Sequence, residues 1–365
     1  MKVAFIVYNA PGRYSGGRIH ALWLAYAFAA NGYEVDYFTN CIPVFWKDMP
    51  SKYRNRIHFI ISKIFMWHKP NKDYKHIVIV PHFASCKSEI VDRLLFYPFA
   101  RRLKESCECL LWYLDFESPS WIFKTDPALR PMAYYRNSNR ILKDCNIVLS
   151  TTKTGQEHAK EYYSKFNSDL KFLQLYLAIN TDAAEGIDYT KESNSAMFFA
   201  RFGQKHKGND AIVNIVKCLP RRFQLDILGD RGAADSNLMT TLEKLCASKE
   251  IKLFFHKNIS DRDKFKLLGN TRIVFFSSNF EGYGIPPLEA QYMGASVVCS
   301  DLPVLREVNP LATYVNFDDL SQLEDAITYL RLNPQIPQQL RMQVERIASP
   351  DTFYSSLGKI LNVIK

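Results

Sequence analysis

The sequence predicts an α/β protein made of two doubly wound, Rossmann-like domains that face a central cleft. Three observations support this prediction. The chain has 365 residues, a length that suggests two domains at roughly 100–200 residues each. Short apolar runs, typical of buried strands, alternate with longer helical patterns. The alternation stops at the polar stretch 180–195 and then restarts, so we interpret this stretch as the hinge between the domains.

Each half contains the strands and helices of one such domain. The predicted strands cover 3–8, 35–38, 77–80, 110–114 and 147–150 in the first half, and 196–200, 225–228, 251–255, 273–277 and 296–299 in the second. Predicted helices cover 17–30 near the N-terminus and, in the second half, 210–219, 237–247, 261–268, 287–293 and 320–330. Ligands of open parallel sheets bind at the carboxyl ends of the strands, so site residues are expected in the loops that follow strands.

The composition excludes several classes of protein. Apolar residues make up 47% and charged residues 23% of the chain, which suits a folded core and not a disordered tail. No apolar run reaches the roughly 20 residues of a membrane span, and no cleavage-site pattern follows the apolar stretch near the N-terminus. The eight cysteines are scattered without a CxxC pair and are expected to be reduced. We therefore expect a cytoplasmic protein.

The positive charge is concentrated in the first half. Residues 1–180 carry 25 basic and 15 acidic side chains, whereas residues 181–365 carry 22 of each. Residues 41–76 hold eight basic and two acidic side chains, interleaved with Phe45, Trp46, Tyr53, Phe59, Phe65, Met66 and Trp67. Segment 93–104 is similar. Basic and aromatic side chains together favour binding to an anionic membrane surface, here the inner face of the membrane. The alternatives are a solvated loop over a small core and a patch that binds nucleic acid.

Two carboxylates follow the predicted strand 273–277. Glu281 and Glu289 are eight residues apart, and the residues between them include Gly282, Gly284, Pro286 and Pro287. These glycines permit a tight loop, and proline suits the first turn of the helix that follows. Carboxylates accept hydrogen bonds from sugar hydroxyls, and a helix N-terminus favours a phosphate. The alternative is a glutamate pair that is stabilised by the helix dipole alone.

Two further loops carry candidate ligand-binding residues. Arg201 and Lys207 follow the predicted strand 196–200, where two cations would match a diphosphate and stabilise its charge as it leaves. A solvated basic loop is the alternative. Gly16 and Gly17 follow the first strand and would let the backbone approach a ligand. They do not form a GxGxxG motif, so no dinucleotide cofactor is expected.

These residues resemble the retaining glycosyltransferases of family 4, which have the GT-B fold. The segment from Glu281 to Val308, EGYGIPPLEAQYMGASVVCSDLPVLREV, looks like the E-x7-E region of that family, and the likeness extends to the two glycines, the Arg/Lys loop, the ILGD segment at 227–230 and residues 256–260. The resemblance implies transfer of a hexose from a GDP- or UDP-linked donor to a glycan or lipid-linked acceptor in envelope polysaccharide biosynthesis, with no metal or other cofactor. Domain 1–180 would bind the acceptor and domain 195–348 the nucleotide sugar, while 349–365 would form a helix that packs back on the first domain.

The resemblance also implies residue roles. Glu281 would bind hydroxyls of the transferred sugar, Glu289 would bind the ribose, and Arg201 and Lys207 would hold the diphosphate. Lys205 is the alternative to Lys207, because the loop is one residue longer than the commonest form. The other donor-binding residues would be Gly17, which lines the cleft, Gly229, Asn258 and Ile259, whose backbone contacts the base, and Gly282, Tyr283 and Gly284.

The acceptor side is less defined. Asp115 ends the predicted strand 110–114 and could take or orient the acceptor hydroxyl proton; Glu117 and His82 are alternatives, and Asp115 could instead be a turn or capping carboxylate. Asp261 and Asp263 form a DxD sequence, but we expect them to cap a helix rather than to bind metal. A nucleotide-sugar epimerase on the same fold and a non-catalytic membrane-bound partner are the alternative functions.

Overall fold

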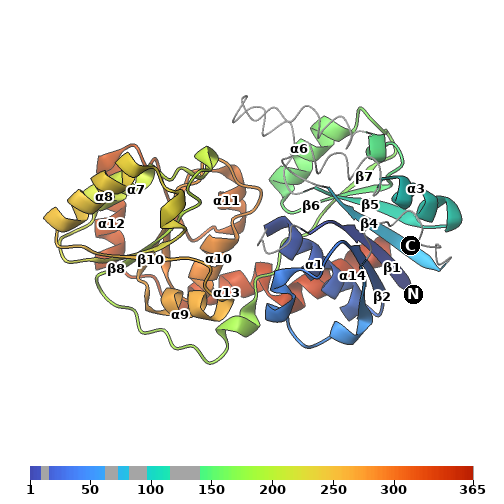
Figure 1. Ribbon diagram of the computed structural model, residues 1–365, viewed down its shortest axis with the longest axis horizontal. Coiled ribbons are helices and arrows are strands. Elements are labelled where there is room, and N and C mark those ends of the chain that lie inside the picture. The colour runs from blue at the N-terminus through green and yellow to red at the C-terminus, as the bar shows by residue number, and fades with distance from the viewer. Residues whose placement is uncertain (10–15, 62–72, 82–96, 116–139, 365) are drawn as a thin grey trace. The chain divides into compact units, whose positions relative to one another are not determined.

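A computed structural model describes residues 1–9, 16–61, 73–81, 97–115 and 140–364. The chain divides into two compact units, which are labelled by their helices and strands in Figure 1. Unit 1 comprises residues 1–178 together with 350–365, and unit 2 comprises residues 179–349. The chain therefore passes between the units twice.

Unit 1 is built on a parallel seven-stranded sheet in the order β3-β2-β1-β4-β5-β6-β7. The strands are β1 (Lys2–Val7), β2 (Glu34–Thr39), β3 (Ile57–Ile61), β4 (Tyr74–Val80), β5 (Leu110–Asp115), β6 (Ile147–Ser150) and β7 (Lys171–Gln174). The predicted fold class is confirmed for this half. The sequence did not predict β3 and β7, because both are edge strands with mostly half-exposed or exposed residues and lack a continuous apolar run.

Helices cover both faces of this sheet. They are α1 (Gly16–Ala30), α3 (Tyr97–Ser106), α6 (Lys153–Tyr163) and α14 (Pro350–Val363), with the short 3-10 turns η1 (Val44–Asp48) and η2 (Arg54–Arg56). Successive side chains of a strand point to opposite faces. Phe5 of β1 accordingly packs with α1 and α14, whereas Ile6 packs with α3 and α6.

The last helix of the chain, α14, belongs to unit 1, where it lies along α1 (Figure 1). The amide of Asn31 donates a hydrogen bond to the backbone oxygen of Tyr354 (2.9 Å). A Cβ on Gly358 would lie 2.5 Å from Asn31 Oδ1, so the two helices are close at this point. Phe353 is 1% exposed in the core that α1 and α14 share.

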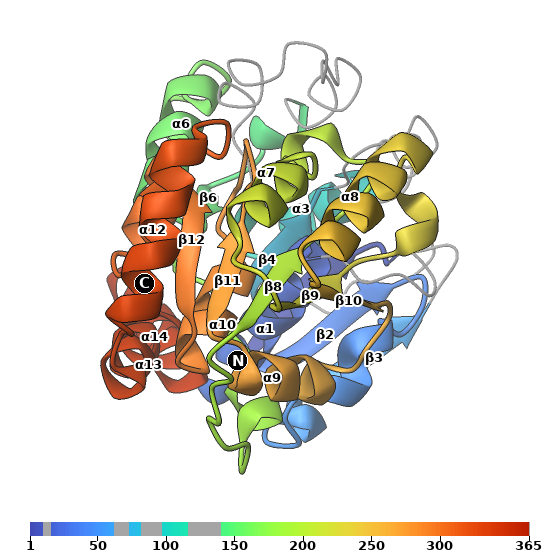
Figure 2. The ribbon, with the colours of Figure 1, turned by 90° about the vertical axis from the view of Figure 1, so that its left-hand side faces the viewer.

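Unit 2 contains a second parallel sheet, in the order β10-β9-β8-β11-β12-β13. Its strands are β8 (Ser195–Phe199), β9 (Gln224–Leu228), β10 (Lys252–His256), β11 (Ile273–Phe276), β12 (Ser296–Ser300) and β13 (Thr313–Val315). Its helices are α7 (Ala211–Cys218), α8 (Ser236–Ser248), α9 (Asp261–Asn270), α10 (Ile285–Tyr292), α11 (Pro303–Val308), α12 (Leu320–Leu332) and α13 (Pro337–Ala348). Three of these helices, α7, α8 and α12, share one apolar core with the sheet (Figure 2).

The polar stretch 180–195 is not a hinge. It belongs to unit 2 and lies against the C-terminal end of α9, where Lys191 Nζ donates to the backbone oxygen of Leu268 (2.7 Å). The backbone N–H of Glu192 donates to the oxygen of Asn270 (3.0 Å). The interpretation as a hinge was wrong, because the polar groups that interrupt the apolar pattern hydrogen-bond to a neighbouring helix.

The described aromatic residues of segment 41–61 pack against the core of unit 1. Phe45 is buried, and the Trp46 ring packs against Phe59 with ring centroids 4.8 Å apart. Arg54 donates to the backbone oxygen of Pro50 (3.0 Å). The role of this segment at a membrane stays a prediction, and Phe65, Met66 and Trp67 lie outside the described residues. Within the described part of the chain, no helix is long and apolar enough to cross a membrane.

We predict that Phe353→Ala destabilises the protein by about 3–5 kcal/mol, because it leaves a cavity between α14 and α1. Thermal melting followed by circular dichroism measures the effect. Ser355→Ala, at an exposed position of the same helix, is the matched control and should leave the melting temperature nearly unchanged. Equal melting of the two variants would show that α14 is not part of this core.

Candidate active site

The second sheet has a topological switch point between β8 and β11. These strands are neighbours, yet the chain continues from β8 toward β9 on one side and from β11 toward β12 on the other. Open parallel sheets bind ligands where such loops diverge. The two loops are residues 200–210 after β8 and residues 277–284 after β11. They carry the predicted cations and the first predicted carboxylate.

The loop after β8 is organised by one buried amide, Asn209. Its Oδ1 accepts a hydrogen bond from the backbone N–H of Arg201 (3.0 Å). Its Nδ2 donates to the backbone oxygens of Arg201 (2.9 Å) and Gln204 (3.2 Å). These bonds close the loop around the 3-10 turn η7 (Lys205–Lys207) and leave the Arg201 side chain exposed. No pattern in the sequence pointed to this role of Asn209.

Gly208 allows the two loops to dock. Its φ is +59°, and a Cβ at this position would lie 2.0 Å from the backbone oxygen of Ser277. Ser277 Oγ donates to the oxygen of Gly208 (2.8 Å), and the N–H of Asn279 donates to the oxygen of His206 (2.8 Å). Only glycine combines a left-handed backbone with such a close approach.

The docked loops bring Lys207 and Glu281 together. Lys207 Nζ lies 2.6 Å from Glu281 Oε1, and Ser278 Oγ donates to the same oxygen (2.7 Å). The side chains of Lys207 and Glu281 are 17% and 11% exposed. The pair is therefore largely removed from water but keeps some surface that a ligand can contact. The choice between Lys207 and Lys205 as the diphosphate-binding lysine stays a prediction. The arrangement places a cation and a hydrogen-bond acceptor side by side at the switch point.

The loop after β11 leads directly into α10. Gly284 has a φ of +99°, and a Cβ there would lie 2.5 Å from a methyl group of Leu305. The N-terminus of α10 has fewer free backbone N–H groups than that of most helices. Pro286 and Pro287 occupy its first turn, and proline has no N–H. Of the four positions without an intrahelical acceptor, Gly284 and Ile285 can therefore donate to a phosphate.

The second carboxylate, Glu289, is buried on α10 and contacts a lysine that the sequence analysis missed. Lys264 Nζ of α9 lies 2.7 Å from Glu289 Oε1 and 2.9 Å from Asp261 Oδ1. Burial raises the pKa of Glu289 to about 7, against the opposing positive charge of Lys264. Burial alone would lower the pKa of Lys264, but the charges of Glu289 and Asp261 outweigh it and raise that pKa.

The remaining donor-binding candidates of unit 2 lie at the same edge of the sheet. Gly229 follows β9, and a Cβ there would lie 2.9 Å from the backbone oxygen of Ala200. Asn258 and Ile259 follow β10; Asn258 is exposed with a φ of +55°, and Ile259 is half-buried. Tyr283 is buried. The structure therefore gathers the predicted nucleotide-sugar residues of this unit at the carboxyl ends of β8, β9, β10 and β11.

The DxD sequence lies in the first turn of α9, and the capping residue is Ser260. Ser260 Oγ accepts a hydrogen bond from the N–H of Asp263 (3.1 Å) and donates to its carboxylate (2.7 Å). Asp261 is engaged by Lys264 (2.9 Å). Among the described residues, no group of three or more His, Cys, Asp or Glu side chains could hold a metal ion.

Two predicted site residues of unit 1, Gly17 and Asp115, lie in the described part of the chain. Gly17 lies in the first turn of α1. Asp115 ends β5, is 3% exposed and accepts a hydrogen bond from Tyr163 Oη (3.0 Å). Burial raises the pKa of Asp115 to about 7, and the bond from Tyr163 opposes that rise. His82 and Glu117 lie outside the described residues, so the choice among the three acceptor-facing candidates stays a prediction.

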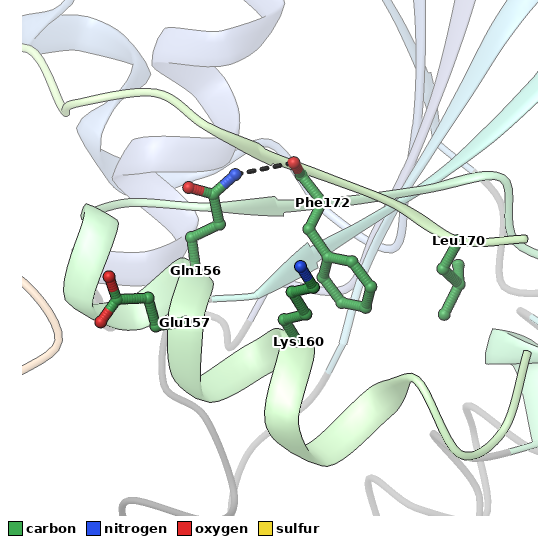
Figure 3. Close-up of a pocket in the computed structure, with 5 residues that line it drawn as sticks. All are labelled: Gln156, Glu157, Lys160, Leu170 and Phe172. Atoms are coloured by element: carbon green, nitrogen blue, oxygen red, sulfur yellow. Dashed lines mark hydrogen bonds between the residues drawn. The ribbon is translucent and has the colours of Figure 1, made fainter. Parts of the chain in front are cut away.

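One open pocket of unit 1 lies between α6 and β7 (Figure 3). It is lined by Gln156, Glu157, Lys160, Leu170 and Phe172. The Gln156 amide donates to the backbone oxygen of Phe172 (2.7 Å) across this pocket. It contains none of the predicted site residues.

The architecture is shared with solved glycosyltransferase structures. Sucrose-phosphate synthase from Thermosynechococcus elongatus superposes with a TM-score of 0.72 at 14% identity, over 100% of this chain and 98% of that chain. Anabaena HepE in complex with UDP-glucose gives a TM-score of 0.67 at 13% identity, over 100% of both chains. Such low identities show the fold alone. The chain consists of two Rossmann-like domains of the GT-B fold, as predicted.

Sequence comparison adds a family likeness for unit 2. Residues 185–346 match the family model described as "Glycosyl transferases group 1", and this range contains all the donor-binding candidates of unit 2. RfbU of Salmonella typhimurium, an O-antigen chain mannosyltransferase, is 25% identical over 211 residues, which is 56% of this chain and 56% of RfbU. The chain thus spans little more than half the length of this relative.

We predict that Gly208→Ala destabilises the protein by at least about 2 kcal/mol, because the new Cβ combines a strained φ with a clash against Ser277. Gly203→Ala is the matched control: its φ is +84°, but a Cβ there meets nothing within 4 Å, so only the backbone cost of about 1 kcal/mol remains. Urea unfolding compares the two. Similar midpoints would contradict the close docking of the loops.

Asp115 should make stability depend on pH. Its folded-state pKa of about 7 exceeds the unfolded value of about 3.9, so its stabilising contribution is full below about pH 4 and is lost as the pH rises to about 7. Asp115→Asn, which stays neutral, should therefore gain stability relative to the wild type over this range, by up to about 4 kcal/mol. Unfolding at several pH values measures this. Asp169→Asn, at an exposed position, is the control. If the stability difference from the wild type is independent of pH for both variants, the raised pKa of Asp115 is contradicted.

Proposed function

We propose that this chain is a retaining glycosyltransferase that moves a hexose from a GDP- or UDP-linked donor to a hydroxyl group of a glycan or lipid-linked acceptor. The observation that carries the proposal is the contact of Lys207 with Glu281 (2.6 Å) at the switch point of the second sheet. Lys207 offers positive charge to a diphosphate, and Glu281 accepts hydrogen bonds from sugar hydroxyls. Their contact supports a diphosphate subsite and a sugar subsite that adjoin each other, as a nucleotide sugar requires.

Each donor group then has a protein partner. Arg201 and Lys207 stabilise the charge that develops on the leaving diphosphate, so the reaction needs no metal ion. Glu289 accepts hydrogen bonds from the ribose, and the backbone near Asn258 contacts the base. The acceptor attacks on the face from which the diphosphate departs, and the leaving phosphate helps to take its proton.

The likeness to RfbU supports a place in envelope polysaccharide biosynthesis and mannose as one candidate sugar. The net positive charge of residues 1–180 supports a peripheral position on the inner face of the membrane, where a lipid-linked acceptor would lie. Since the described aromatic rings of segment 41–61 are packed in unit 1, exposed lysines such as Lys47 and Lys52 would supply this attraction.

A diphosphate screen followed by an activity assay tests the proposal. We expect one of UDP, GDP, TDP and ADP to raise the melting temperature in the presence of a chelator, since a ligand at 100 times its Kd stabilises by about 2.7 kcal/mol. The matching nucleotide sugar should then be hydrolysed or transferred. Glu281→Gln should reduce turnover about 100-fold or more, because it removes the charged acceptor at the sugar.

Glu243→Gln, which changes an exposed carboxylate of α8 that pairs with Arg231, is the control and should keep full activity. The proposal fails if no diphosphate stabilises the protein and no donor turns over, or if Glu281→Gln is as active as the wild type. A product formed from the donor alone, with the nucleotide still attached, would indicate an epimerase instead.

A further inference from the structure

Lys264 has no part in the proposed reaction, yet it occupies a central place beside the site. A chain of polar contacts runs from Asn180 through Asp261 and Lys264 to Glu289. Asn180 Nδ2 donates to Asp261 Oδ2 (3.2 Å), Asp261 Oδ1 lies 2.9 Å from Lys264 Nζ, and the same nitrogen lies 2.7 Å from Glu289 Oε1. The lysine is therefore held from one side and contacts the carboxylate on the other.

Burial distinguishes this lysine from its neighbour on the same helix. Lys266 also pairs with an aspartate three residues earlier, Asp263, but those side chains are 57% and 56% exposed, and such a surface pair contributes little. The side chains of Lys264 and Glu289 are 16% and 6% exposed. Removing one partner of a buried pair leaves the other charge uncompensated, which is costly. The two lysines of α9 thus differ in environment and not in spacing.

We infer that Lys264 is a positioning residue of the nucleotide subsite, which holds the Glu289 carboxylate ionised and aimed at the hydroxyls of the donor ribose. The inference rests on the proposed function, in which Glu289 binds the ribose. Lys264 occupies Oε1, and within the described part of the chain no hydrogen bond reaches Oε2. That oxygen is left for the ligand.

Ionisation matters because hydrogen bonds to a carboxylate are stronger than those to the protonated acid, which also becomes a donor. Burial raises the pKa of Glu289 and so favours the protonated acid, whereas the ammonium group of Lys264 favours the carboxylate. Without Lys264, Glu289 takes a proton or turns toward solvent. In both cases the ribose contact weakens, while Arg201 and Lys207 still attract the diphosphate. The expected signature is a selective loss of ribose recognition.

Calorimetric titration tests this with the nucleoside diphosphate that stabilises the wild type most and with its 2′,3′-dideoxy counterpart. We expect the wild type to bind the ribose form about 10-fold tighter or more, the value of one or two charged hydrogen bonds. In Lys264→Met this preference should fall to within about 3-fold of unity, and Lys264→Arg should restore most of it. Lys266→Met, the matched control on α9, should keep the wild-type preference.

The outcomes separate this inference from the proposed function. If the wild type binds neither diphosphate, the proposed function fails. If it binds both forms equally, or if Lys264→Met keeps the preference, the inference is overturned while nucleotide binding stands. If Lys264→Met does not fold, Lys264→Gln replaces it, because glutamine keeps a hydrogen-bond donor without the charge. A ribose preference that is at least about 3-fold lower in Lys264→Gln than in the wild type supports the inference. An unchanged preference in this variant overturns it.

Discussion

The close approach of two loops at the switch point of the second sheet is the constraint on which the candidate site depends. Because β8 and β11 are parallel neighbours whose connections diverge, their following loops meet at one edge. Gly208 lets them touch, since any side chain there would overlap Ser277. Lys207 and Glu281 then share a site that neither loop could form alone.

Burial explains why each glutamate at this edge has its own lysine. A carboxylate removed from water is costly unless a charge or hydrogen bonds compensate it. Lys207 compensates Glu281 and Lys264 compensates Glu289. The two pairs differ in their surroundings: the lysine of the first belongs to a loop that also carries the exposed Arg201, whereas the lysine of the second also pairs with Asp261. This difference suits the Lys207–Glu281 pair to an anionic ligand and the Lys264–Glu289 pair to uncharged hydroxyl groups.

Much of the fold could be predicted from the sequence, because buried parallel strands are continuous apolar runs that need no tertiary context to be recognised. Edge strands such as β3 and β7 escaped because their residues are half exposed or exposed. Composition alone could not place the rings of Trp46 and Phe59. An aromatic ring beside a lysine looks the same in the sequence whether it packs into a core or faces a membrane, and the contact between these two rings comes from the tertiary structure.

The sequence by itself determined the local part of the site: a glycine-rich loop with Glu281, followed by a helix that begins near two prolines and carries Glu289. Those features depend on backbone preferences within a few residues. Only the tertiary structure decided which cation meets each carboxylate. Lys207 and Glu281 are 74 residues apart, and Lys264 and Glu289 are 25 apart. Their contacts follow from strand order and helix packing, which no local pattern encodes.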